Sequence, residues 1–181
     1  FRALRGFGHY EEAVDDLNRS FAADPKYTWF GPALNDEKGR KSLLRELSAA
    51  AERRPEAAWL QAWRGFCLLE TGSAQEALAC LERALGREKK SGLIYAWRGR
   101  AWRDLGRLER ASADLRRAVR LSPELCAAHE ILSQVQEARG ELAAALSSLS
   151  RATRLAPTTV PYLLAKARLA LRLNRREEAA A

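Results

Sequence analysis

The chain lacks the residue groupings on which most catalytic and metal sites depend. It has only two histidines and three cysteines among 181 residues, and no two cysteines form a Cys-x-x-Cys pair. This cysteine pattern argues against a disulfide framework and against a structural zinc site. No phosphate-binding loop, His-Glu-x-x-His helix or nucleophile elbow occurs either. We therefore expect no enzyme active site, no metal and no cofactor in these residues.

Long apolar runs and glycine are also scarce. No apolar stretch approaches the roughly 20 residues that a membrane-spanning helix needs, so no membrane partner is expected. Glycine contributes only 11 residues, whereas alanine, leucine and arginine dominate, a composition that favours helix throughout. The three cysteines, Cys67, Cys80 and Cys126, are expected to be buried thiols. A Cys67–Cys80 bridge across a helix hairpin is the alternative. Free thiols indicate a reducing compartment, so we expect a cytoplasmic location.

The sequence repeats itself with a 34-residue period. Ala62-Trp63-Arg64-Gly65 recurs as Ala96-Trp97-Arg98-Gly99. The further rows at the same spacing are Gly72, Gly106 and Gly140; Ala77, Ala111, Ala145 and Ala179; Leu81, Leu115 and Leu149; Ala84, Ala118 and Ala152; and Pro123 and Pro157. Self-similarity at such a period is typical of helical repeat proteins.

Each unit has the pattern of two helices. In residues 59–92 the first helix is predicted to run to about Glu70 and to turn at Thr71-Gly72. Apolar residues at helical spacing follow in the second helix. Ser73 and Glu76 have the spacing of a capping box at the start of that helix.

Helix starts are also predicted elsewhere. Ser122-Pro123 has the pattern of an N-cap followed by a first-turn proline, which would open the next helix there. Glu177-Glu178 are expected to open another second helix, where acids favour the positive end of the helix dipole.

Residues 26–58 depart from the repeat. Ala13 and Ala77 share a repeat position, but the distance between them falls four positions short of two full repeats. The second helix of this irregular unit is predicted from Leu43, Leu44, Leu47, Ala50 and Ala51, and should end before Pro55. In the first half, Gly31-Pro32 predicts an abbreviated helix or an ordered loop. That segment would contain Tyr27, Trp29 and Phe30.

This pattern resembles the tetratricopeptide repeat. Residues 93–125 match the family at Gly99, Gly106, Ala111, Leu115, Ala118 and Pro123. The resemblance implies an all-α fold, a right-handed superhelical solenoid of stacked antiparallel helix pairs in 34-residue repeats, over residues 1–181. The expected units are a partial repeat 1–25, an irregular repeat 26–58, the repeats 59–92, 93–125 and 126–158, and a partial repeat 159–181.

The resemblance also implies that the first helices of the units line a concave groove. Trp63 and Trp97 stand two residues, about 200° on a helix, from where the family usually has its tryptophan. We therefore expect both rings to point into the groove, where Trp59 and Phe66 would complete an aromatic anchor site. The alternative is that neighbouring helices or the irregular segment cover Trp59 and Trp63.

Charged residues recur on the same expected face. Arg100, Arg103, Arg168 and Arg172 suit an acidic peptide or a free C-terminal carboxylate, because arginine binds carboxylates in a bidentate fork. The other polar groove candidates are Asp104, Glu130 and Gln134. The alternative is a solvated face on which Asp104, Glu130 and Glu137 balance the arginines. His129 is expected to be a packing residue.

The favoured function is a protein–protein interaction module, an adaptor or scaffold that binds a peptide or protein segment in the groove. It is not expected to be the family's chaperone-tail clamp, because that clamp needs lysine and asparagine at the positions of Ala62, Trp63, Phe66, Ala96 and Trp97. One alternative is the substrate-recognition arm of a larger enzyme. Self-association is another, because an uncapped solenoid end exposes apolar surface.

A single-stranded nucleic-acid binder is the less favoured alternative. The formal net charge of +8 fits it. However, the aligned groove positions Trp63, Trp97, Ile131 and Ala165 form no base-reading code of the kind that helical-repeat RNA readers use.

Overall fold

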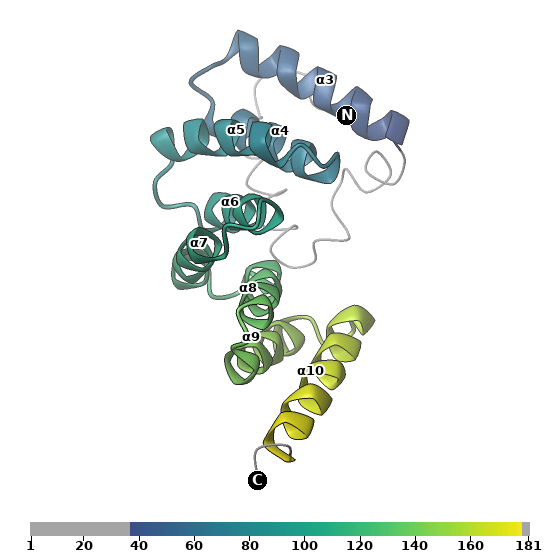
Figure 1. Cartoon of the computed structure of the whole chain (residues 1–181). Coiled ribbons are helices and arrows are strands. Elements are labelled where there is room, and N and C mark those ends of the chain that lie inside the picture. Colours follow the sequence, from purple (N-terminus) through teal and green to yellow (C-terminus); the bar gives the residue numbers. More distant parts are fainter. Residues whose placement is uncertain (1–36, 179–181) are drawn as a thin grey trace.

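The described part of the chain is built from helices alone. The computed structural model describes the backbone of residues 37–178 and the side chains of residues 37–174. In this range there are eight helices and no strand: α3 (Glu37–Arg53), α4 (Ala58–Glu70), α5 (Ala74–Arg87), α6 (Gly92–Asp104), α7 (Leu108–Leu121), α8 (Cys126–Ala138), α9 (Leu142–Leu155) and α10 (Val160–Glu178). Figure 1 shows them stacked in chain order from α3 to α10. The prediction of an all-α solenoid is confirmed.

The helices pair through a repeated glycine turn. Gly72, Gly106 and Gly140 have φ of 81°, 71° and 78°, a left-handed conformation that glycine adopts without steric cost. The amides after them close the turn, as where Ser73 donates to the carbonyl of Leu68 at 2.8 Å. These turns join α4 to α5, α6 to α7 and α8 to α9. We call α4, α6 and α8 the first helices and α5, α7 and α9 the second helices.

Small residues let the two helices of each hairpin approach closely. A Cβ added to Gly65 would lie 2.7 Å from the Leu81 Cγ, and one added to Gly99 would lie 2.6 Å from the Leu115 Cγ. In the third hairpin the Ser133 hydroxyl donates to the Ala145 carbonyl at 2.8 Å. The repeated small and leucine positions therefore set the same helix separation in successive hairpins.

The first helices lie on the inside of the curve. α4 contacts α6 and α6 contacts α8 directly, while successive second helices do not contact one another to a comparable extent. A stack that is closer on one side bends toward that side. The first helices therefore line the concave face. The helix pairs fall close to the expected units 59–92, 93–125 and 126–158, whose boundaries stay predictions.

The second helix of the irregular unit is present as α3. Leu43, Leu47 and Ala51 are buried in it, and the helix ends before Pro55 as expected. The partial repeat 1–25 and the segment with Tyr27, Trp29 and Phe30 lie outside the described residues.

Three predicted helix starts are wrong in detail. Ser73 is the N-cap residue of α5, but its side chain makes no capping hydrogen bond there. Ser122 ends α7 instead of opening α8, because the chain first makes a turn in which the Leu125 amide donates to the Ser122 carbonyl at 3.1 Å. Glu177-Glu178 end α10 instead of opening a helix. Asn174 stands one repeat after the turn glycine Gly140. A positive φ is costlier for asparagine than for glycine, and α10 continues through this position.

Candidate functional site

A row of charged and amide side chains crosses the concave face along α4, α6, α8 and α10. Its members, which we call the polar ladder, are Glu70, Arg100, Arg103, Asp104, Glu130, Gln134, Glu137, Arg168 and Arg172. Several share a repeat position: Asp104 lies one repeat after Glu70, and Gln134 and Arg168 lie one and two repeats after Arg100. This spacing places them on equivalent faces of α4, α6, α8 and α10.

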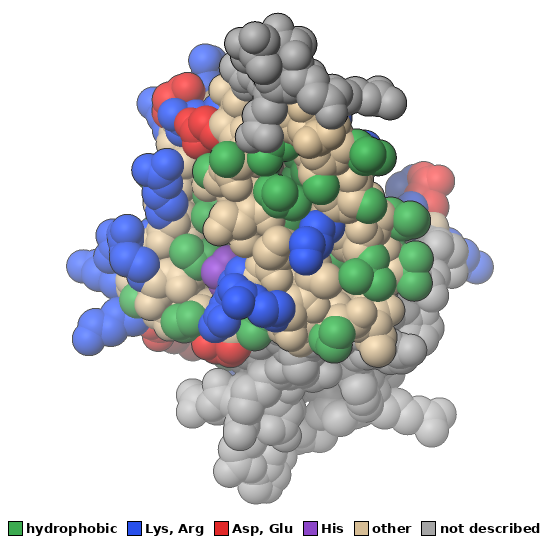
Figure 2. Space-filling model, turned by 90° about the horizontal axis from the view of Figure 1, so that it is seen from below, with side chains coloured by type: hydrophobic (Ala, Val, Ile, Leu, Met, Phe, Trp, Pro, Cys, Tyr) green, Lys and Arg blue, Asp and Glu red, His purple; other side chains and the backbone are tan. Residues whose placement is uncertain are grey.

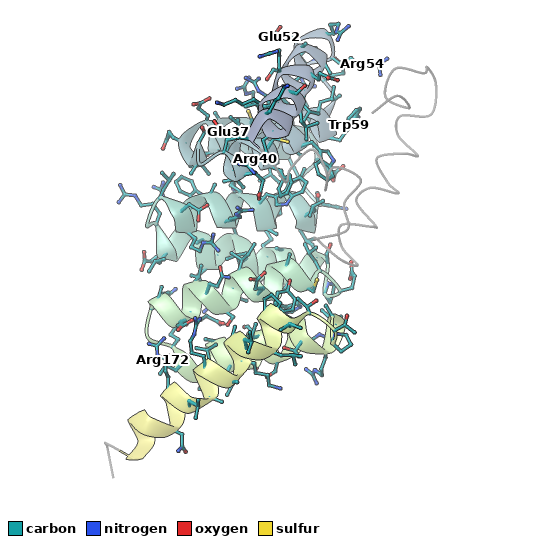
Figure 3. The ribbon with its side chains drawn as sticks, turned by 90° about the vertical axis from the view of Figure 1, so that its right-hand side faces the viewer. Glu37, Arg40, Glu52, Arg54, Trp59 and Arg172 are labelled. Carbon is teal, nitrogen blue, oxygen red and sulfur yellow. The ribbon has the colours of Figure 1, made fainter. Side chains whose placement is uncertain are left out.

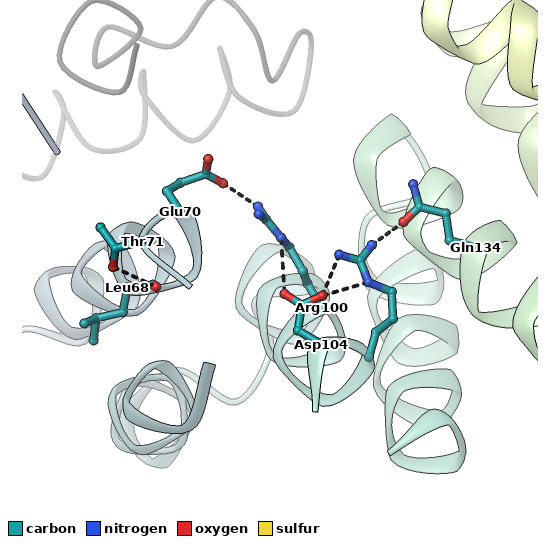
Figure 4. Close-up of polar contacts among 7 residues, drawn as sticks. Leu68, Glu70, Thr71, Arg100, Asp104 and Gln134 are labelled. Atoms are coloured by element: carbon teal, nitrogen blue, oxygen red, sulfur yellow. Dashed lines mark hydrogen bonds and ion pairs between the residues drawn. The ribbon is translucent and has the colours of Figure 1, made fainter. Parts of the chain in front are cut away.

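The α4–α6 part of the ladder is a set of ion pairs (Figure 4). Arg100 Nη1 donates to Glu70 Oε1 at 2.5 Å, which bridges the two helices. Within α6, Arg103 donates to Asp104 Oδ1 from Nε at 3.0 Å and from Nη2 at 2.7 Å. Arg100 Nε also lies 3.9 Å from Asp104 Oδ2. Asp104 is thus shared between two arginines.

The ladder continues across α8 to α10. Arg103 Nη1 donates to Gln134 Oε1, and Gln134 Nε2 donates to Glu130 Oε1 at 2.9 Å. Further along, Glu137 accepts from Arg172 and lies 3.5 Å from Arg168 Nη2. A side-chain contact therefore joins each successive pair among α4, α6, α8 and α10.

The four ladder arginines thus already have acidic or amide partners within the chain. This arrangement supports the alternative in which Asp104 and Glu137 balance them. The exposure of the four differs, however. The side chains of Arg168 and Arg172 are 65% and 51% exposed, against 26% for Arg100 and 25% for Arg103. Arg168 and Arg172 are the pair that an incoming anion can reach most easily.

The expected exposure of the aromatic residues in the groove is wrong. Trp63, Phe66 and Trp97 are only 2%, 5% and 3% exposed. The ring centroids of Trp63 and Trp97 lie 5.0 Å apart, edge to face, and Phe66 stacks on Trp97 at 4.9 Å. The rings bury apolar area against each other between α4 and α6, which is more favourable than exposing it. They are a core cluster in the described structure.

Trp59 is half-buried and stands apart from the ladder. Figure 3 shows Trp59 and Arg172 near opposite edges of the stack. From the predicted set, the structure thus brings together Arg100, Arg103, Asp104, Glu130 and Gln134, and separately Arg168 and Arg172. The predicted binding residues did not include Glu70 and Glu137, although Glu137 was expected on the same face as a counter-charge to the arginines. The signal for Glu70 was present, since it shares its repeat position with Asp104.

The three cysteines and His129 have the properties of packing residues. Cys67, Cys80 and Cys126 are buried thiols outside any disulfide, as predicted, and burial raises the pKa of the Cys67 thiol to about 12. His129 is half-buried, with a ring nitrogen 3.0 Å from the Pro123 carbonyl, and burial lowers its pKa. Among residues 37–174 no group of three or more His, Cys, Asp or Glu could hold a metal ion. No described helix is long and apolar enough to cross a membrane.

Comparison with known proteins supports the repeat pattern. A sequence profile described as Tetratricopeptide repeat matches residues 68–125 and 98–160, which together cover more than half of the chain. No curated protein sequence matches the chain.

Solved structures show the same fold at low sequence identity. The first TPR domain of the human RPAP3 protein has a TM-score of 0.64 at 19% identity, covering 68% of this chain and 98% of that one. A crystal structure of MamA has a TM-score of 0.66 at 18% identity, covering 78% and 83%. The first TPR of Spaghetti (RPAP3) bound to the HSP90 peptide SRMEEVD has a TM-score of 0.62 at 19% identity, covering 65% and 93%.

Proposed function

The chain belongs to the tetratricopeptide repeat family, and on that premise we propose that it is an adaptor or scaffold module that holds a peptide or protein segment on its concave face. Domains of this family mediate protein–protein interactions. The observation that carries the proposal is the polar ladder, which presents hydrogen-bonding groups from the four alternate helices α4, α6, α8 and α10 on one face. An extended segment lying across those helices would meet one set of polar groups per helix.

The partner we propose is acidic or ends in a free carboxylate. Arg168 and Arg172 are the most exposed ladder arginines, and both lie against one acid, Glu137. A carboxylate from a partner could pair with the arginine that Glu137 holds less closely, Arg168 at 3.5 Å, without leaving a buried charge unpaired. One similar structure is bound to the peptide SRMEEVD, which is itself acidic. This chain has Trp63, Phe66 and Trp97 where the family's chaperone-tail clamp has polar residues, so a different acidic sequence is proposed.

The experiment is a pull-down from cell lysate, read by mass spectrometry. The baits are the parent chain, the groove variant Arg168→Glu/Arg172→Glu, and a control with the same charge change on an outer helix, Arg151→Glu/Arg154→Glu on α9. Both control arginines are exposed. We expect a protein that the parent and the control retain and the groove variant loses. Equal retention by all three baits would overturn the proposed site.

Two other functions remain as outcomes of this experiment. Capture of a polypeptide that has an enzymatic domain would favour a substrate-recognition role. Loss of capture after nuclease treatment would favour nucleic acid. A cytoplasmic location is likewise a proposal, which a fluorescent fusion of the full-length polypeptide would test.

A further inference from the structure

A second set of arginines lies on the outer surface of the solenoid, on α7 and α9. We call the following residues the outer arginine face: Arg110, Arg116, Arg117, Arg120, Arg151 and Arg154. All six are exposed, and no acid among residues 37–174 forms an ion pair with any of them. Figure 2 shows Lys and Arg side chains gathered along its left-hand edge, the side on which α7 lies in Figure 1. The polar ladder differs, since acids and an amide bind its arginines.

The outer arginine face follows the repeat. Arg117 and Arg151 are one repeat apart, and so are Arg120 and Arg154, so each pair stands on equivalent faces of α7 and α9. A second helix turns this face away from the stack, so the face stays uncovered whether or not further repeats follow α10. Its exposure is therefore a property of the repeat and not of an end of the solenoid.

Few acids offset these arginines. α9 contains no Asp or Glu. Of the two acids of α7, Asp114 is buried and accepts from Arg98 of α6, and Glu109 is exposed. Six arginines against this one glutamate give the exposed side chains of α7 and α9 a formal charge of +5. A surface of this charge attracts a polyanion.

The helix dipole explains only part of this pattern. Cations are favoured in the last turn of a helix, which accounts for Arg120 and Arg154. Arg116, Arg117 and Arg151 lie before the last turn, where the effect of the dipole has faded. Helix stability therefore leaves half of the outer arginine face without a reason.

Two of the arginines are held in place by aromatic rings. The Arg117 guanidinium carbon lies 4.6 Å from the Tyr95 ring centroid, and the Arg110 guanidinium carbon lies 4.8 Å from that of Trp102. A side chain that is ordered before binding loses less conformational entropy when it meets a ligand. Tyr95 is buried and Trp102 half-buried. The described part of this face thus offers guanidinium groups and no open ring on which a base could stack.

The charges form a patch and not a single line. Arg117 and Arg120 are about 4.5 Å apart along the axis of α7. α7 and α9 both pack on α8, so their axes are at most about 20 Å apart at the usual separation of packed helices. An extended acidic peptide presents one line of charge, whereas a duplex presents two phosphate strands on either side of a groove. The major groove of B-DNA, about 12 Å wide, falls within this span, whereas that of an RNA duplex is narrow.

We propose that the outer arginine face binds the phosphate backbone of double-stranded DNA without reading its sequence. Guanidinium groups match phosphate oxygens in a bidentate fork. The helices of the solenoid pack side by side, so no single helix is free to enter the major groove, and the contact needs no base-reading code. This inference goes beyond the proposed function and uses the opposite face. The chain can therefore hold a protein segment on the polar ladder and DNA on the outer arginine face together.

The first experiment measures binding of the 181-residue chain to a labelled DNA duplex by fluorescence anisotropy over a series of salt concentrations. The outer variant is Arg117→Gln/Arg120→Gln/Arg151→Gln/Arg154→Gln. The control, which has the same charge change at four other exposed arginines, is Arg45→Gln/Arg53→Gln/Arg168→Gln/Arg172→Gln. Each phosphate that a guanidinium neutralises adds about 0.9 to the steepness with which log K falls against log salt. The outer variant should therefore have a slope about 3 to 4 units shallower than the parent, and the control should keep the slope of the parent within about 1 unit.

Circular dichroism should show the same helix content for all three chains. If the outer variant loses helix, Arg151→Gln/Arg154→Gln alone changes neither arginine that lies over a ring, and should make the slope about 2 units shallower. A parent that does not bind the duplex at low salt overturns the proposal, and so does a folded outer variant with the slope of the parent. Loss of binding in the control alone would assign the DNA to the concave face and would also overturn it.

Competing ligands separate double-stranded DNA from other polyanions. Duplex DNA has one negative charge per about 1.7 Å, denser than one per about 3.3 Å in an extended acidic peptide, so it releases more counterions. Poly-glutamate, phosphatidylserine vesicles, an RNA duplex and a DNA single strand should each bind the parent less tightly than the DNA duplex at the same salt concentration. Two DNA duplexes of unrelated sequence should bind equally. Tighter binding of any of the four competitors, or a marked preference for one duplex sequence, contradicts the proposal.

Discussion

The α4–α5 and α6–α7 hairpins have the same shape but different polar chemistry. In both, a glycine of the first helix lies against a leucine of the second, with nearly equal closest distances for an added Cβ, 2.7 and 2.6 Å. In the second hairpin Arg98 donates to both carboxylate oxygens of Asp114, at 2.7 and 2.8 Å. The equivalent residues of the first hairpin are Arg64 and Cys80. No described residue accepts a hydrogen bond from the buried Arg64 Nε.

The difference teaches which positions determine the fold and which are free to vary. The small residue and the leucine set the helix separation, and both hairpins keep them. The arginine–acid pair is present in only one hairpin, so the fold does not require it. The ion pair also lies beside an aromatic ring: the Arg98 and Arg117 guanidinium carbons are 5.4 and 4.6 Å from the Tyr95 ring centroid.

The largest expected effect concerns the shared leucines. Leu81→Ala and Leu115→Ala each remove a fully buried side chain, so each should lower the free energy of unfolding by about 2–5 kcal/mol. Because the two sites have the same neighbours by repeat position, the losses should agree within about 1 kcal/mol. Urea unfolding followed by circular dichroism measures both. A much smaller loss at one site would show that the hairpins do not share one packing rule.

The Arg98–Asp114 ion pair, which only the α6–α7 hairpin of the two has, should make the cost of mutation differ between them. Asp114→Ala leaves the half-buried Arg98 guanidinium without its bidentate partner, and should cost about 2–3 kcal/mol. Cys80→Ala, at the equivalent position, removes no ionic partner and should cost about 1 kcal/mol. The same urea titrations apply, with Asp114→Asn as the variant that keeps the size of the side chain. Equal losses of unfolding free energy for Asp114→Ala and Cys80→Ala would show that the ion pair adds no stability specific to the α6–α7 hairpin.

A smaller effect is expected from the glycine contact itself. Gly99→Ala should lower stability by about 1 kcal/mol, because overpacking against Leu115 costs about 1–3 kcal/mol and exceeds the gain in helix propensity. Gly86→Ala is the matched control, since nothing lies within 4 Å of a Cβ added there in α5. That variant should gain up to about 1 kcal/mol. Thermal unfolding should therefore shift in opposite directions for the two variants.

The smallest effect concerns the third hairpin, which has His129 where the second has Tyr95. Burial holds the pKa of His129 in the folded chain below its ordinary value of 6.5, and Arg151 lowers it further. As pH falls below about 6.5, the unfolded chain therefore binds a proton before the folded one, and stability falls until the folded pKa is passed. The His129→Gln variant should lack this fall. Denaturation midpoints measured between neutral and acidic pH should diverge for parent and variant, and parallel curves would contradict the burial effect.

Sequence reasoning recovered the backbone architecture well because its cause is local and repeated. The 34-residue rows contain the turn glycines with positive φ, and α3 followed from the apolar spacing around Leu43 and Leu47. The helix starts were less accurate. Ser73 and Ser122 have N-cap chemistry, but whether a hydroxyl reaches an amide depends on the turn geometry before it. Ser91, by contrast, does cap α6, where its hydroxyl accepts from the Ile94 amide at 3.3 Å.

The site was only partly predictable. The position of Trp97 in the repeat predicts the direction of its ring. It does not predict how closely α4 approaches, and the Trp97 ring is packed against Trp63 and Phe66 of that helix. The partners of Arg100 and Arg103 depend on how α4, α6 and α8 align side by side. Repeat register indicates which positions face each other, whereas the choice of Glu70 and Gln134 as acceptors required coordinates.

The most direct test of the concave binding face is hydrogen–deuterium exchange of the chain with and without the partner that the pull-down identifies. We predict slower exchange in α4, α6, α8 and α10, where the polar ladder lies, and unchanged exchange in α5, α7 and α9. Protection confined to the second helices would contradict the account and assign binding to the convex face.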